Sequence, residues 1–137
     1  MSRKRLRRKA HRRAGKEADR AWDALEDGDV GLALKEIRRA VHEAGDSPAI
    51  WTDYGRILRI AGQLKESEKA LRSAILIAPD YADAYADLAE TLSGMGLTIQ
   101  AHRMISRAVE LKPQVPLYRE LERKHRAALP PDHPDRE

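Results

Sequence analysis

The sequence predicts an all-α protein of three stacked helical hairpins and a capping helix, and two observations lead to this prediction. Glycine recurs every 34 residues, at Gly28, Gly62 and Gly96, and proline keeps the same spacing at Pro79 and Pro113. Apolar residues between them recur every three to four positions, the period of an α-helix. Such a repeat indicates stacking, because one hairpin cannot bury its own apolar face. The period is shared by Ala40, Ala74 and Ala108, by Ile37, Leu71 and Ile105, and by Trp51 and Tyr85.

The middle hairpin shows how each element is bounded. Ser47 and Pro48 mark the start of its first helix, since serine caps free amides and proline is tolerated in the first turn. Gly62 ends that helix, because a left-handed residue is least costly for glycine. Pro79 prevents the second helix from continuing. The expected apolar positions are Trp51, Tyr54, Gly55 and Leu58 on the first helix, and Leu64, Ala70, Leu71, Ala74 and Ile75 on the second.

The same reading extends to the ends of the chain. A capping helix is expected after the third hairpin, with Leu117, Tyr118, Leu121 and Ala128 turned inward. Two successive prolines end it, and the charged, proline-containing tail that follows is expected to be disordered. The predicted parts are a basic arm at 1–16, a repeat domain at 17–129 with repeats at about 14–47, 48–81 and 82–115 and a capping helix at 116–129, and a disordered tail at 130–137.

This pattern resembles the tetratricopeptide repeat (TPR) family over about residues 14–115. The first unit departs from the family pattern, because Glu17 stands where the aromatic belongs and Gly45 replaces the proline. The resemblance implies a right-handed superhelix whose first helices line a concave groove that holds a peptide. The last unit matches the pattern most fully, with Tyr85, Leu88, Ala89, Leu92, Ala101, Ile105, Ala108 and Pro113.

The resemblance also places the residues that would face a partner. Asp19, Asp53 and Asp87 repeat with the period on the groove side of the first helices. Ala18 and Trp22 stand where chaperone-binding members have a carboxylate-clamping Lys and Asn, so no such clamp is expected. Trp22 is expected to pack under the arm rather than to anchor a ligand. The mixed charge favours a ligand of alternating charge over a plain carboxyl terminus. The predicted groove residues are Thr52, Asp53, Arg56, Arg59, Asp83, Asp87 and Glu90.

Charge is distributed unevenly along the chain. The net charge is +4, yet residues 1–16 carry nine cations and no acid, so the rest of the chain carries −5. Mutual repulsion predicts that the isolated arm is poorly ordered. Neutralised by phosphates, it would extend the first helix, although Gly15 weakens that extension by about 1 kcal/mol relative to alanine. The cations are Arg3, Lys4, Arg5, Arg7, Arg8, Lys9, Arg12, Arg13 and Lys16.

Several partners for this arm stay open: nucleic acid or a ribonucleoprotein, an acidic protein surface, or no specific partner. Leu6 is its only large apolar residue apart from Met1, so insertion into a membrane has little support. The arm holds no aromatic residue to stack on bases, so contact with nucleic acid would be mainly with phosphates. About six such contacts would weaken binding about 10³-fold between 50 and 200 mM salt.

The sequence offers little for catalysis. It has no cysteine, no glycine-rich phosphate loop and no helical histidine pair with a third zinc ligand. His42 and His102 are expected on the surface among charged residues. No enzyme activity, cofactor or metal is therefore expected. No apolar run suits a secretory signal or the roughly 20 residues of a membrane span, which favours a cytoplasmic location.

The sequence thus predicts a protein-interaction module, an adaptor or scaffold that binds a peptide or protein in its groove, with the arm as an electrostatic tether. One alternative is a nucleic-acid or ribonucleoprotein-associated protein that binds through the arm. Another is a structural subunit of a larger assembly, including assembly with itself.

Overall fold

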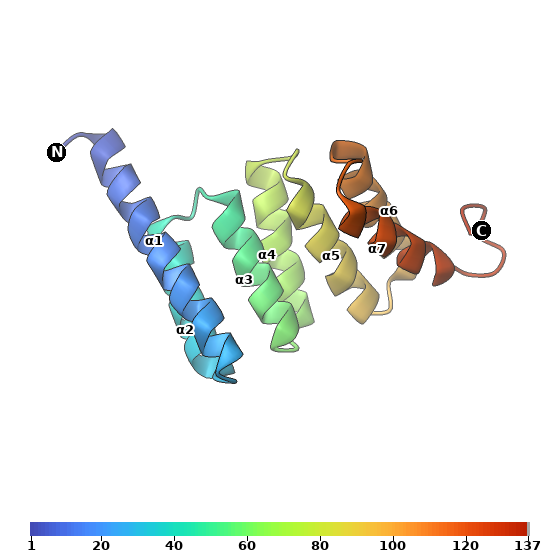
Figure 1. Cartoon of the computed structure of the whole chain (residues 1–137), viewed down its shortest axis with the longest axis horizontal. Helices are drawn as coiled ribbons and strands as arrows, with labels where there is room; N and C mark the ends of the chain where they lie inside the picture. Colours follow the sequence, from blue (N-terminus) through green and yellow to red (C-terminus); the bar gives the residue numbers. More distant parts are fainter. Residues whose placement is uncertain (137) are drawn as a thin grey trace.

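A computed structural model describes residues 1–136, and within that range the secondary structure is entirely helical. Figure 1 shows the helices side by side in chain order, with the start of α1 extending beyond its neighbours. Glu137, the last residue of the predicted tail, lies outside the described residues. The helices are α1 (Arg3–Glu26), α2 (Val30–Glu43), α3 (Pro48–Ile60), α4 (Leu64–Ile77), α5 (Ala82–Gly94), α6 (Thr98–Leu111) and α7 (Pro116–Ala127).

The helices pair as three hairpins, α1 with α2, α3 with α4 and α5 with α6, and α7 packs on α6 and α5. Helix α2 contacts α3 and α4 contacts α5, while α1, α3, α5 and α7 also contact one another in that order. In the described range no contact joins the first hairpin to the third. The predicted all-α stack of repeats with a capping helix is confirmed.

The three periodic glycines close the three hairpins in the same way. Gly28, Gly62 and Gly96 have φ of 80°, 82° and 79°, which only glycine adopts without strain. After each glycine the next amide donates to a carbonyl five residues back, as from Gln63 to Leu58 at 2.9 Å. This is the Schellman arrangement that satisfies the last carbonyls of a helix. Ser47 caps α3 as predicted, accepting a hydrogen bond from the amide of Ile50.

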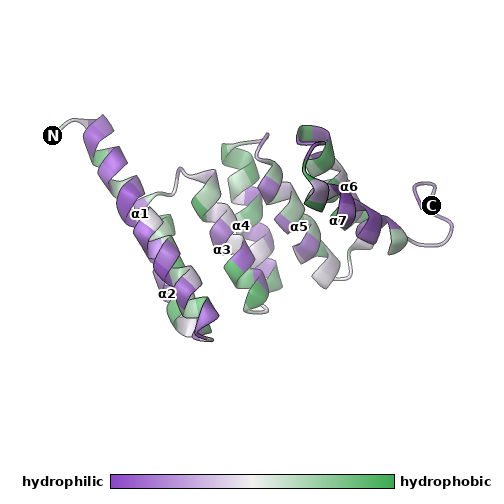
Figure 2. Cartoon of the chain, viewed as in Figure 1, coloured by the Kyte–Doolittle hydropathy of each residue, from purple (hydrophilic) through white to green (hydrophobic). Residues whose placement is uncertain are grey.

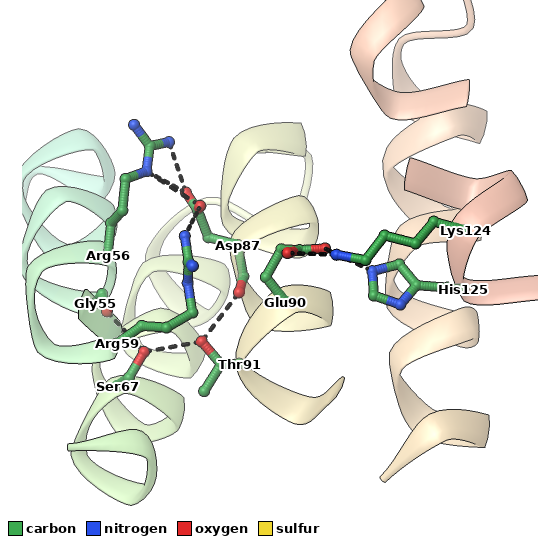
Figure 3. Close-up of polar contacts among 9 residues, drawn as sticks. All are labelled: Gly55, Arg56, Arg59, Ser67, Asp87, Glu90, Thr91, Lys124 and His125. Atoms are coloured by element: carbon green, nitrogen blue, oxygen red, sulfur yellow. Dashed lines mark hydrogen bonds and ion pairs between the residues drawn. The ribbon is translucent and has the colours of Figure 1, made fainter. Parts of the chain in front are cut away.

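A close approach of α3 to α4 depends on Gly55. A Cβ atom at this position would lie 2.5 Å from Cγ of Leu71, which is fully buried. Ser67, where the family pattern has alanine, donates to the Gly55 carbonyl at 2.6 Å and lies 2.9 Å from the hydroxyl of Thr91 on α5. These buried contacts tie the second hairpin to the third (Figure 3).

The aromatic position of the repeat has a polar role as well as an apolar one. The Trp51 indole donates to the Gly45 carbonyl at 2.8 Å, and the Tyr85 hydroxyl donates to the Pro79 carbonyl at 2.7 Å. Each donor reaches six residues back, to the turn before its own helix. Arg119 on α7 does the same, donating to the Pro113 carbonyl at 2.8 Å. The corresponding Glu17 lies within α1, and residue 11, six positions earlier, is itself helical, so an aromatic donor at position 17 would have no turn carbonyl to reach.

The predicted disorder of the basic arm is wrong in this structure, because α1 runs through residue 16 without a break. Ser2 caps it by accepting from the Arg5 amide. The prediction considered repulsion alone and did not include acids from the end of α2 and from the turn after it. Asp46 pairs with Arg7 and His11 at 2.7 Å, and Arg13 pairs with Glu43 at 3.2 Å.

The capping helix and the tail also differ from expectation. Tyr118 is buried as predicted, but Leu117 and Ala128 are exposed, and His125 and Leu129 fill the inward positions instead. The helical period counted from Tyr118 reaches residues 125 and 129, so Leu117 is one position off the inward side.

Two further differences concern the end of the stack. The tail after Leu129 forms turns, in which the His133 amide donates to the Pro130 carbonyl at 2.9 Å. The His133 ring meets the ring of His102 edge-on. His102 is buried rather than on the surface, and this burial lowers its pKa.

Candidate functional site

The groove residues predicted from the sequence lie where α1, α3, α5 and α7 meet along one side of the stack. We call this surface the odd-helix face. Thr52 does not contribute to it, because Thr52 is 3% exposed and its hydroxyl donates to the Pro48 carbonyl within α3. The face is made by Asp19 and Trp22 on α1, Asp53, Arg56 and Arg59 on α3, Asp83, Asp87 and Glu90 on α5, and Tyr118, Lys124 and His125 on α7.

Asp87 holds the centre of the odd-helix face. Its carboxylate, 9% exposed, receives a bidentate contact from Arg56, with distances of 3.1 Å from Nε and 2.7 Å from Nη2. Arg59 approaches Oδ1, the oxygen nearer to Nε of Arg56, at 3.7 Å (Figure 3). Two guanidinium groups offset the cost of burying this charge. Asp87 carries a single charge, so it neutralises Arg56, which it meets at 2.7 Å, and offsets the charge of Arg59 only in part.

Arg56 also links Asp87 to α1, through Trp22. The Arg56 guanidinium lies 5.9 Å from the ring centre of Trp22, within the range of a cation–π interaction. The hydrogen bonds that Arg56 donates to the Asp87 carboxylate raise the pKa of Arg56. Thr91, one turn along α5, donates to the Asp87 carbonyl and holds its backbone. Trp22 thus packs against the centre of the face rather than under the basic arm.

Asp53 is in the opposite situation. It is half-buried beside Asp87 and Asp19, and no ion pair engages Asp53 or Asp19 in the described part of the chain. Burial raises the pKa of Asp53 to about 6, and the neighbouring aspartates act in the same direction against the attraction of Arg56. At neutral pH the face therefore carries two carboxylates, Asp19 and Asp53, without a cation to neutralise either fully.

Glu90 and Asp83 serve a different purpose, because they attach the capping helix. Glu90 lies 2.8 Å from Nε2 of His125 and 3.0 Å from Nζ of Lys124, as Figure 3 shows. The hydrogen bond from His125, followed by the contact with Lys124, lowers the pKa of Glu90 to about 2. The Tyr118 hydroxyl donates to Asp83, and burial together with this contact raises the pKa of Tyr118.

Sequence reasoning missed Tyr118, Lys124 and His125 as members of this face. A signal was available, because Lys124 lies 34 residues after Glu90 and so falls on the repeat period. The capping helix continues the register of the first helices, and its residues at groove positions meet those of α5.

The predicted polyanion-binding residues all lie on the N-terminal half of α1. Arg7 and Arg13 form ion pairs with Asp46 and Glu43. The other seven are exposed and lack an ion pair within residues 1–136. They are Arg3, Lys4, Arg5, Arg8, Lys9, Arg12 and Lys16.

None of the helices up to residue 136 is both long enough and apolar enough to span a membrane. In the same range, histidine and acidic side chains do not gather in any group of three or more that could hold a metal ion.

Stacked antiparallel hairpins, each closed by the same glycine turn, define a helical-repeat protein. Residues 58–124 match the family model described as tetratricopeptide repeat. Residues 58–124, just under half of the chain, thus match the tetratricopeptide repeat family, and the described stack as a whole has the fold of this family.

Solved structures with the same fold have little sequence identity to this chain. The Arabidopsis OM64 TPR domain has a TM-score of 0.79 at 14% identity, covering 88% of this chain and 99% of that one. The first TPR of Spaghetti (RPAP3), bound to the HSP90 peptide SRMEEVD, has a TM-score of 0.78 at 15% identity, covering 86% and 94%. The second TPR domain of human RPAP3, in complex with the HSP70 peptide SGPTIEEVD, has a TM-score of 0.75 at 20% identity, covering 85% of this chain and 97% of that one. No curated protein matches the sequence.

Proposed function

We propose that this chain is a protein-interaction module whose odd-helix face binds a peptide or protein segment carrying basic side chains. One observation carries the proposal: Asp19 and Asp53 are left without a cation, while Arg56 and Arg59 are already held by Asp87. A cationic group of a ligand would find carboxylates without an ion pair on this face, whereas a carboxylate would compete with Asp87 for the two guanidinium groups. In this proposal the chain acts as an adaptor or scaffold without a catalytic role.

Structural neighbours support the general role but suggest a different ligand charge. The Spaghetti and human RPAP3 domains are bound to the peptides SRMEEVD and SGPTIEEVD, whose last residues are mostly acidic. The excess charge on the odd-helix face of this chain is negative. Electrostatic complementarity therefore favours a ligand of opposite sign to those peptides.

The raised pKa of Asp53 adds a second argument. A half-buried carboxylate that is charged at neutral pH destabilises the fold unless a cation approaches it. A basic ligand group would supply that cation, so part of the energy lost on folding would be recovered on binding. Functional sites often keep such locally unfavourable groups.

A pair of probe peptides tests the proposal. Binding of SRMEEVD and of a charge-reversed amide, SEMRRVR, is measured by fluorescence polarisation near physiological salt. We expect the charge-reversed peptide to bind more tightly, and Asp19→Asn with Asp53→Asn to weaken it about tenfold, equivalent to about 1.4 kcal/mol. The matched control is Glu66→Gln with Glu110→Gln, which removes two exposed acids from α4 and α6 and is expected to leave binding unchanged.

The opposite preference would contradict the proposal. If SRMEEVD binds more tightly and its affinity falls on Arg56→Gln, the face accepts carboxylates despite the pairing with Asp87. If both peptides respond equally to the aspartate pair and to the control pair, binding reflects overall charge and not this face.

A further inference from the structure

The cations at the start of α1 divide into two groups with different surroundings. Arg7 and Arg13 point to the body of the protein, where Asp46 and Glu43 neutralise them. Ala14 and Ala18 are buried on this same inward side. The remaining cations are exposed and have no acidic partner within the described chain. Their positive charge is therefore not neutralised by ion pairs within residues 1–136.

Five of these cations form a single row along α1. Within this row Arg5 lies four residues before Lys9, and Arg8, Arg12 and Lys16 are also four residues apart. Lys9 lies three residues before Arg12, so all five share the outward side of the helix. We call this row the α1 stripe. At 1.5 Å per residue it is about 16 Å long. Figure 2 shows this strongly hydrophilic part of α1 extending past the rest of the stack.

We propose that the α1 stripe is a docking surface for the sugar–phosphate backbone of double-stranded nucleic acid. A duplex carries one negative charge per about 1.7 Å of its axis when both strands are counted, so about 16 Å of duplex holds roughly nine phosphates, more than the five cations of the stripe. The helix holds these cations in fixed positions before binding, which reduces the entropy lost on association. Repulsion among them in the free protein is relieved by the phosphates.

The composition of the stripe distinguishes this partner from an acidic protein. Stable protein interfaces have an apolar or aromatic core that carries most of the binding energy. The stripe has no apolar residue, and Leu6 lies off it. Interfaces with nucleic acid are polar and strongly positive, as this one is.

The absence of aromatic residues favours duplexes over single strands. Proteins that bind single strands stack successive bases on aromatic side chains. Residues 1–16 contain no aromatic residue apart from the half-buried imidazole of His11, which is held by Asp46. Contacts limited to phosphates fix the position of the protein on the duplex without reading its sequence.

A salt titration with matched variants tests this inference. The full chain is titrated onto short mixed-sequence RNA and DNA duplexes, and fluorescence anisotropy is recorded from 50 to 200 mM KCl. If all five stripe residues meet phosphates, the affinity falls about 500-fold over this range. Arg5→Gln, Lys9→Gln, Arg12→Gln and Lys16→Gln together are expected to remove most of this salt dependence. Glutamine keeps helix propensity, and circular dichroism verifies that α1 remains helical.

The control variant is Arg7→Gln with Arg13→Gln, which removes two cations from the same helix but none from the stripe. Its salt slope is expected to stay close to that of the unchanged chain, since the slope counts phosphates contacted. The inference is overturned if the control lowers the slope as much per charge removed, or if duplexes do not bind at 50 mM KCl. Tighter binding to polyglutamate, or to a single-stranded RNA of the same length, also overturns it in favour of an acidic protein or a single strand.

This inference is independent of the proposed peptide-binding function. The stripe variant leaves Asp53 and Arg56 unchanged, so it is expected to retain the preference for the charge-reversed peptide. Conversely, Asp53→Asn is expected to leave the salt slope of duplex binding unchanged.

Discussion

Among single residues, Asp87 and Asp53 show how position on one face sets the state of a carboxylate. The two residues occupy equivalent positions, 34 residues apart. Asp87 forms ion pairs with two arginines, whereas Asp53 forms none within the described residues. The nearest guanidinium is oriented toward Asp87, so Asp53 is left with burial and like charges, which raise its pKa. The two aspartates thus differ in what they offer a ligand.

Replacing Asp53 by asparagine is expected to stabilise the protein at neutral pH. The pKa of Asp53 is about 6 in the folded chain against an ordinary value of 3.8. Between these values the native state holds a proton that the unfolded state has lost, so the free energy of unfolding decreases as pH rises. The full shift corresponds to about 3 kcal/mol. Screening at this half-buried site reduces the expected gain at pH 7 to about 1 kcal/mol.

Urea unfolding as a function of pH measures this gain. The difference between Asp53→Asn and the unchanged chain should disappear below about pH 4, where both are uncharged at this position. Asp19→Asn, at an exposed site, is the control and should change stability by less than about 0.5 kcal/mol. A loss of stability at pH 7 in Asp53→Asn would show that Arg56 already compensates the charge.

Glu90 has the opposite pH dependence. Its pKa is about 2 in the folded chain, below the ordinary 4.5, so its contribution is complete above pH 4.5 and is lost as pH falls toward 2. Glu90→Gln is expected to cost about 2 kcal/mol at pH 7, because charge-assisted hydrogen bonds to α7 become neutral ones. Between about pH 4.5 and pH 2, the free energy of unfolding of the variant should therefore decrease less than that of the unchanged chain.

An exposed acid provides the comparison for Glu90. Glu110→Gln removes a carboxylate that is 67% exposed and pairs only with Arg107, so its effect should stay below about 0.5 kcal/mol. If Glu90→Gln behaves like this control at pH 7 and in acid, α7 is held by its apolar contacts and not by Glu90.

At the scale of helices, the packing of α3 on α4 depends on the absence of one side chain. Gly55→Ala would place Cβ against fully buried Leu71. We expect it to destabilise by about 2 kcal/mol, because overpacking outweighs the gain of up to about 1 kcal/mol in helix propensity. Gly15→Ala, with no neighbouring atom within 4 Å, should instead stabilise by about 0.5–1 kcal/mol.

A double mutant separates sterics from propensity. In a Leu71→Ala background, Gly55→Ala should become neutral or stabilising, since the clashing atoms are gone. Thermal and urea unfolding of the four proteins provide the comparison. A destabilising effect of equal size with and without Leu71 would mean that the close approach is not the cause.

The elements also show what the sequence could and could not predict. Gly28, Gly62 and Gly96 were sufficient to place the turns, because local backbone geometry alone requires glycine there. The order of α1 could not be predicted from its own residues, since Asp46 and Glu43 reach it only after α2 folds back. The same holds for Arg56 and Asp87, which the period places on one face but whose pairing depends on how two hairpins stack.

For the whole molecule, linear stacking separates two surfaces of opposite sign. The stripe on α1 is positive and extends beyond the hairpins, and the odd-helix face that begins at Asp19 has a negative surplus. Both surfaces begin on α1: the stripe occupies its N-terminal half, and the odd-helix face starts at Asp19 and continues over α3, α5 and α7. This arrangement suits an adaptor that holds two partners of opposite charge at once.

The most direct test of the peptide-binding account is where the charge-reversed peptide SEMRRVR binds. Two-dimensional ¹H–¹⁵N NMR spectra of the labelled full chain are recorded during the titration. We expect shift changes at Asp19, Trp22, Asp53 and Arg56, including the Trp22 indole, and little change on α2, α4 and α6. Shift changes confined to the even helices, or spread evenly over the acidic surface, would contradict a binding site on the odd-helix face.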